Sequence, residues 1–86
     1  MDDEEIRRLC EHLAATAELP VDREASRWLG EAEAVACDLV GADLDADVLE
    51  TRLETVRTLV SEVEDTGHPE ADNHVDAARR ILRGTE

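Results

Sequence analysis

The stretch VDREASRWLGEAEAVACDLV, residues 21–40, decides the fold. Its apolar positions are separated alternately by four and three residues, and they are Val21, Ala25, Trp28, Ala32, Val35 and Leu39. Such a heptad repeat places one apolar seam along a helix face. Gly30 lies inside the repeat at a cost of about 1 kcal/mol relative to alanine, which indicates a close helix approach or a local break. The sequence predicts a long helix over Val21–Val40, with Gly41 as its C-terminal cap.

The same spacing recurs in the next segment. Its apolar positions are Leu49, Leu53, Val56, Val60 and Val63. Asp45 precedes them as the N-cap, and Leu44 is placed to contact Leu49 as a hydrophobic staple. This segment therefore predicts a second long helix, from Asp45 to about Asp65.

Two shorter amphipathic segments flank this central pair. The first, Asp3–Ala17, carries an apolar face made of Ile6, Cys10, Leu13 and Ala17. The last begins at Pro69, ends before Gly84, and carries an apolar face made of Ala71, Val75, Ala78 and Leu82. Acidic residues open both segments, which suits the positive N-terminal end of a helix dipole.

The arrangement predicted for these helices is an all-α, antiparallel up-down four-helix bundle in a single domain, residues 1–86. Short connections favour antiparallel neighbours, and a chain of 86 residues is too short for a second core. The alternative is an extended hairpin of the two central helices that pairs with a second copy. In either arrangement, the second and third helices offer a surface for dimerisation.

The charge of the chain predicts the salt concentration in which the protein works. All nine basic residues are arginine, and 23 acidic residues give a net charge of -14. Carboxylates hold water and ions at a surface, whereas lysine exposes a long hydrocarbon stem. The pattern is typical of a protein that works in molar salt.

The whole chain resembles the small acidic all-helical proteins of unknown function from extremely halophilic archaea. The resemblance lies in the lysine-free surface, the alanine-rich heptads and the closing segment of the type GHPEAD, residues 67–72. It implies a cytoplasm rich in KCl, and it implies no particular activity.

Cysteine usage and the acidic N-terminus also predict a cytoplasmic protein. Met1-Asp2-Asp3-Glu4-Glu5 lacks the basic start of a secretory signal, and no apolar run is long enough to cross a membrane. Cys10 and Cys37 occupy apolar helical positions, so we expect two buried thiols, with a disulfide or a metal pair as the alternatives.

Potential metal ligands are densest at the start of the last helix. Glu70 and His74 lie four residues apart on one helix face, and His68 precedes them. A third ligand would have to come from another helix, from Glu64 or His12. The competing interpretation places His68 in a turn and His74 at the edge of the core.

The sequence shows no catalytic constellation and no basic face. Cys10 and His12 are two residues apart, so they diverge on a helix and cannot act as a nucleophile and base. The arginines stand among acidic residues at helical ion-pair spacings, which argues against nucleic acid as a partner. We therefore expect neither an enzyme nor a bound cofactor.

Trp28 is the residue best suited to anchor a protein partner, because tryptophan is enriched at interface hot spots. Its seam position favours core packing. At a bundle edge, it would instead lie at the centre of a homodimer contact, with Arg27 and Glu31 as the charged rim. The predicted function is a non-enzymatic helical interaction module, homodimeric or bound to another protein; the alternative is a divalent-cation-binding protein that uses Glu70 and His74.

Overall fold

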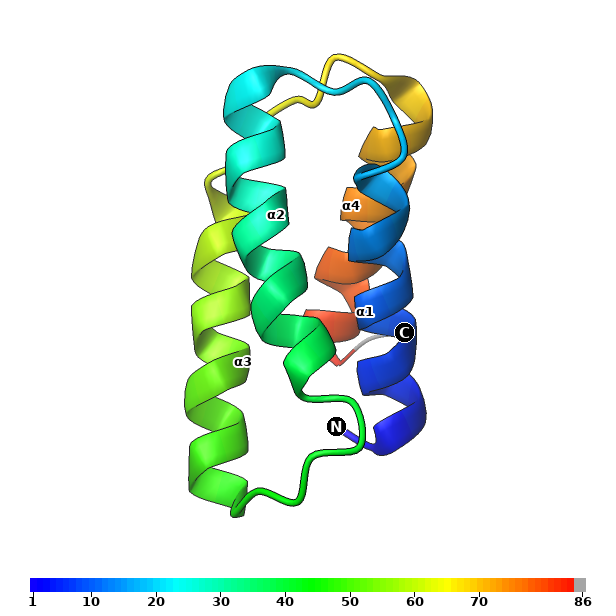
Figure 1. The fold of residues 1–86 in the computed structure, drawn as a ribbon. Helices are drawn as coiled ribbons and strands as arrows, with labels where there is room; N and C mark the ends of the chain where they lie inside the picture. Colours follow the sequence, from blue (N-terminus) through cyan, green and yellow to red (C-terminus); the bar gives the residue numbers. More distant parts are fainter. Residues whose placement is uncertain (85–86) are drawn as a thin grey trace.

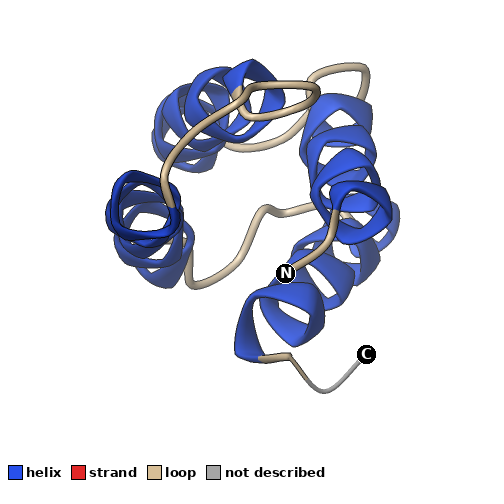
Figure 2. Cartoon of the chain, turned by 90° about the horizontal axis from the view of Figure 1, so that it is seen from below, coloured by secondary structure: helices blue, strands red, loops and turns tan. Residues whose placement is uncertain are grey.

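The computed structural model describes residues 1–84 and confirms an all-α, four-helix bundle (Figure 1). The helices are α1 (Asp3–Thr16), α2 (Arg23–Asp38), α3 (Ala46–Ser61) and α4 (Pro69–Arg83). The loops after α1 and α3 lie at one end of the molecule, and the loop after α2 lies at the other (Figure 1). The four helices surround a common centre when seen along the bundle (Figure 2).

Local sequence signals explain the start of α1 and both ends of α4. Asp2 and Glu5 form a reciprocal capping box at the start of α1, in which each side chain accepts the other residue's backbone N–H. Pro69 opens α4, and Gly84 ends it in the left-handed conformation with φ 75°. The helix predicted from Val21 begins instead at Arg23, since the backbone N–H of Asp22 donates to the carbonyl of Thr66.

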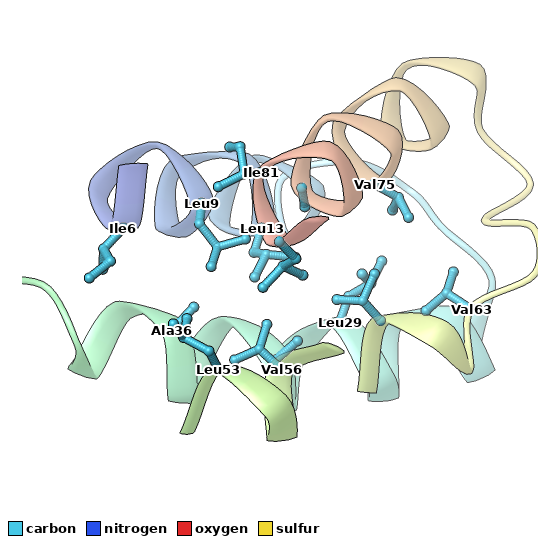
Figure 3. Close-up of a cluster of buried hydrophobic side chains, with 14 of the residues drawn as sticks. Ile6, Leu9, Leu13, Leu29, Ala36, Leu53, Val56, Val63, Val75 and Ile81 are labelled. Carbon is cyan, nitrogen blue, oxygen red and sulfur yellow. The ribbon is translucent and has the colours of Figure 1, made fainter. Parts of the chain in front are cut away.

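The core consists of leucine, valine, isoleucine and alanine side chains from all four helices (Figure 3). The most deeply buried large side chains include Leu9, Leu13, Leu29, Leu53, Val56 and Ile81. On α2 the buried face is rotated relative to the predicted seam, so that Leu29 and Ala36 are buried. Trp28 and Val35 are therefore half-buried at the edge of the core.

Helix α1 packs between α2 and α4, and α3 packs mainly on α2. The contact between α3 and α4 is the weakest of the four. Two arginines cross it: Arg57 donates from Nε to the carbonyl of Leu82 at 3.2 Å, and Arg79 donates to the carbonyls of Val60 and Val63. Val60 and Leu82 lie in the last turns of α3 and α4, and Val63 follows the end of α3.

The expectation of two buried thiols is wrong, because Cys10 and Cys37 form a disulfide between α1 and α2. The two residues lie on facing flanks of the helices, with Cα atoms 4.8 Å apart, within the range that a disulfide spans. Both are half-buried rather than fully buried. Closing a loop across a sequence separation of 27 residues stabilises the fold by about 3.5 kcal/mol on the chain-entropy model.

Candidate functional site

Two histidines from the first and last helices meet at the flank of the bundle. His12 on α1 and His74 on α4 place their Nδ1 atoms 3.0 Å apart, with ring centroids separated by 5.2 Å and ring planes inclined at 47°. Both rings are half-buried, so solvent reaches them. Of the three histidines in the chain, these two form a pair across 62 residues of sequence.

Burial and neighbouring charge act together on this pair. Partial burial lowers the pKa of His12 below its ordinary value, and the nearby His74, Arg8 and Arg80 lower that pKa further. Glu11 opposes them by raising it. His12 therefore favours the neutral imidazole at neutral pH, with a lone pair available on one ring nitrogen.

The other residues named as metal candidates do not form a group of three ligands with this pair within residues 1–84. His68 occupies the N-cap position before Pro69, and its Nδ1 is buried without a hydrogen-bond partner among residues 1–84. Glu70 is exposed in the first turn of α4. Within the same residues, no three His, Cys, Asp or Glu side chains converge on a common metal position. The structure thus joins His74 to His12.

Asp72, the remaining acidic residue of this turn, has a structural partner. Its carboxylate accepts hydrogen bonds from the backbone N–H and the hydroxyl of Thr66, at 3.0 and 2.7 Å. These bonds lower the pKa of the Asp72 carboxyl below its ordinary value, the backbone bond contributing most. Thr66 is fully buried, so the pair fixes the loop between α3 and α4.

Trp28 borders an acidic hollow. The guanidinium of Arg27 lies 5.2 Å from the ring centroid of Trp28, a cation–π contact. Beside the ring is a hollow of about 280 Å³ whose acidic lining is Asp22, Glu24, Glu62, Glu64 and Asp65. Two copies that met directly over Trp28 would bring these carboxylates together, so a contact centred there is electrostatically unfavourable.

The outward face of α2 has a different character. A line of small residues, Ser26, Gly30 and Ala34, runs along it, and all three are exposed. Arg23 and Arg27 lie on the N-terminal half of this face, while Glu31 and Asp38 lie on the C-terminal half. We call these seven residues the α2 face. Together with the half-buried Glu33, which lines the same hollow as Ser26 and Gly30, this surface carries two arginines and three acidic residues, in a chain whose net charge is -14.

Gly30 has no structural reason inside the chain to be glycine. Helix α2 is continuous through it, and a Cβ added there would meet no atom within 4 Å. The sequence offered a close helix approach or a local break as alternatives for Gly30, and within residues 1–84 neither is found around it.

The fold defines the chain as a small all-α bundle, and comparison with known proteins places it in a family. A family model described as a domain of unknown function (DUF8152) matches residues 5–85, so the chain belongs to that family. No curated protein and no solved structure matches it. Within residues 1–84, no helix is long and apolar enough to cross a membrane.

Proposed function

We propose that this chain is a non-enzymatic helical interaction module, and that it pairs with a second copy of itself through the α2 face. The observation that carries the proposal is Gly30, an exposed helical glycine with open space around its Cα. Glycine costs about 1 kcal/mol in a helix interior relative to alanine. A closely packed partner helix offsets that cost, because small residues allow two backbones to approach.

The charges of the α2 face support a second copy as the partner. If two α2 helices cross near Gly30 in opposite directions, the arginine half of each face lies against the acidic half of the other. Arg23 and Arg27 of one copy then neighbour Glu31 and Asp38 of the second copy. Among residues 1–84, Arg23 and Arg27 form no ion pair within the chain, so both are available for pairing.

This arrangement keeps Arg27 and Glu31 of the interface predicted from the sequence and changes the role of Trp28. Its ring borders the α2 face from the side of α3, where it supports Arg27. The small residues beside it form the centre of the contact. The buried residues of the original seam, such as Ala32 and Leu39, serve the core of the same chain.

Salt determines whether two such copies associate. Each copy carries a charge of -14, and at dilute salt their mutual repulsion extends well beyond the contact. At 1 M salt the Debye length falls to about 3 Å, so only adjacent charges still interact. The complementary groups of the α2 face then favour pairing, which fits a protein of a salt-accumulating cytoplasm.

The cytoplasmic location remains a proposal, and the disulfide weighs against it. Cytoplasmic thiol systems keep most cysteines reduced, although some intracellular proteins do retain disulfides. Alkylation of free thiols at the moment of cell lysis, followed by mass analysis, reports the state of Cys10 and Cys37 in cells. Fully alkylated cysteines fit a reducing cytoplasm; a protected pair points to an oxidising compartment.

Replacing Gly30 tests the interaction module directly. Gly30→Gln adds a side chain into open space, so the isolated fold keeps or gains stability, while the approach of a second helix is blocked. In molar KCl, light scattering should give the mass of a dimer for the natural chain and the mass of a monomer for Gly30→Gln.

Thr55→Gln, which adds the same side chain on the exposed surface of α3, is the matched control and should remain dimeric. A natural chain that is monomeric at every protein concentration in molar KCl would refute self-association. A Gly30→Gln variant that dimerises as well as the natural chain would refute the α2 face as its site.

A further inference from the structure

We propose that His12 and His74 form a binding site for a borderline divalent transition-metal ion such as Zn²⁺, held by the Nδ1 atoms of both rings. The site does not depend on the pairing of two copies, since both ligands come from the same chain. It differs from the set expected from sequence, because His12 replaces Glu70 and His68.

The distance between the two nitrogens suits a shared metal ion. Zinc–nitrogen bonds of about 2.0–2.1 Å at a tetrahedral angle separate two ligand nitrogens by about 3.3 Å. The two Nδ1 atoms lie 3.0 Å apart. A rotation of both rings, which turns their lone pairs from each other toward a common point, therefore admits the ion, and the half-buried rings leave it an entry path.

Binding of the ion requires that neither Nδ1 atom carries a proton, and a change of tautomer in one ring meets this requirement. A hydrogen bond between two Nδ1 atoms requires that one neutral ring carries its proton on Nδ1 and the other carries it on Nε2. When the metal binds, the first ring transfers its Nδ1 proton through solvent to its own Nε2. Both rings remain neutral, both Nδ1 lone pairs bind the ion, and no proton is gained or lost.

The charges around the pair select the kind of cation. Glu11 attracts a positive ion, whereas Arg8 and Arg80 repel it. Hard cations such as Ca²⁺ and Mg²⁺ prefer several oxygen ligands and gain little from imidazole. Zn²⁺ and Cu²⁺ form strong bonds to neutral imidazole nitrogen, so they tolerate the arginines better.

Water or chloride completes the coordination. No third His, Cys, Asp or Glu within residues 1–84 converges on the pair, so two protein ligands hold the ion. Such a site binds more weakly than a closed structural zinc site and leaves positions open for exchange. Because one ligand comes from α1 and the other from α4, the ion also links the first and last helices.

Titration with ZnCl₂ followed by calorimetry tests the proposal. We expect saturable binding of one Zn²⁺ per chain, and a loss of affinity of more than about tenfold in His12→Asn and in His74→Asn. Loss of even an outer-shell partner costs roughly 10–100-fold at metal sites. His68→Asn is the matched control, and it should bind like the natural chain. All four proteins share the same carboxylates, so weak binding at the acidic surface cancels in the comparison.

A spectroscopic readout identifies the ligand atoms. Nitrogen-15 spectra of the imidazole rings should show Zn²⁺ shifting the Nδ1 signals of His12 and His74, with both rings protonated at Nε2. Circular dichroism of each variant establishes that its helices are intact. Equal affinity in His12→Asn and the natural chain would overturn the proposal, as would an Nε2 shift or a comparable loss in His68→Asn.

Discussion

Individual side chains explain how a core that contains no phenylalanine or tyrosine packs in a single arrangement. Leu9, Leu13 and Leu29 are almost completely buried, and buried alanines such as Ala32 and Ala36 let the helices approach closely. At the edge of the apolar core, specific hydrogen-bonded polar pairs hold the chain in place. Thr66 and Asp72 are the clearest case, since a buried hydroxyl and a backbone N–H both donate to one carboxylate.

Asp72 should give the fold a defined dependence on acid. Its pKa is lowered in the folded state, so it stabilises the fold above its ordinary pKa of about 3.9, and that contribution is lost as the pH falls through the lowered value. In urea unfolding, Asp72→Asn should therefore be less stable than the natural chain at pH 7, and the difference should shrink toward pH 2.

Thr66→Val provides the complementary variant, because it removes the hydroxyl that donates to Asp72. In that background the effect of Asp72→Asn should be smaller at every pH. A difference between the natural chain and Asp72→Asn that is constant from pH 7 to pH 2 would show that the carboxylate charge does not stabilise the loop.

The sequence predicts four helices because each one carries its own periodicity, but α3, expected to reach about Asp65, ends at Ser61, and α2, expected to reach Val40, ends at Asp38. Pro69 and Gly84 mark the limits of α4 in both the pattern and the structure. The pattern fails where an end depends on another part of the chain, as at Asp22, which bonds to Thr66 instead of starting the helix. It also placed Trp28 in a central seam, because a heptad repeat does not reveal which neighbouring helices complete the core.

The candidate site depends on how two helices are aligned, which one sequence does not reveal. His12 was only one of two possible third ligands for a set based on Glu70 and His74, and the spacing within α4 favoured Glu70. The pairing of His12 with His74 requires the alignment of α1 with α4. The sequence favours two buried thiols over the disulfide for the same reason, since Cys10 and Cys37 each look like an ordinary apolar helical position.

Because the contact between α3 and α4 is small, the arginines that bridge these two helices should contribute to the stability of the fold. Arg79→Gln should destabilise the fold by about 1–3 kcal/mol, because it leaves the carbonyls of Val60 and Val63 without their charged donor. Chemical denaturation measures the change. Arg52→Gln, an exposed arginine on α3, is the control and should change stability by less than about 0.5 kcal/mol. Equal effects of the two substitutions would mean that Arg79 does not stabilise the contact.

The charge of the whole molecule should make its stability depend on salt. Raising KCl from 0.1 M to 1 M shortens the Debye length from about 10 Å to about 3 Å, which screens repulsion among the 23 acidic residues. The thermal midpoint, followed by helical circular dichroism, should therefore rise.

A variant with several exposed acids neutralised, for instance Glu18→Gln, Glu24→Gln and Asp43→Asn together, should show a smaller rise. The same salt response in both proteins would mean that general salt effects on apolar burial, and not charge screening, determine stability.

A charge exchange across the α2 face tests whether the chain pairs with a second copy of itself through that face. Arg27→Glu and Glu31→Arg are each measured alone and then together by sedimentation equilibrium in molar KCl. Each single variant should dimerise more weakly than the natural chain, and the double variant should regain affinity because opposite charges again face each other across the two copies. Single variants that dimerise like the natural chain, or a double variant no tighter than either single one, would refute pairing through this face.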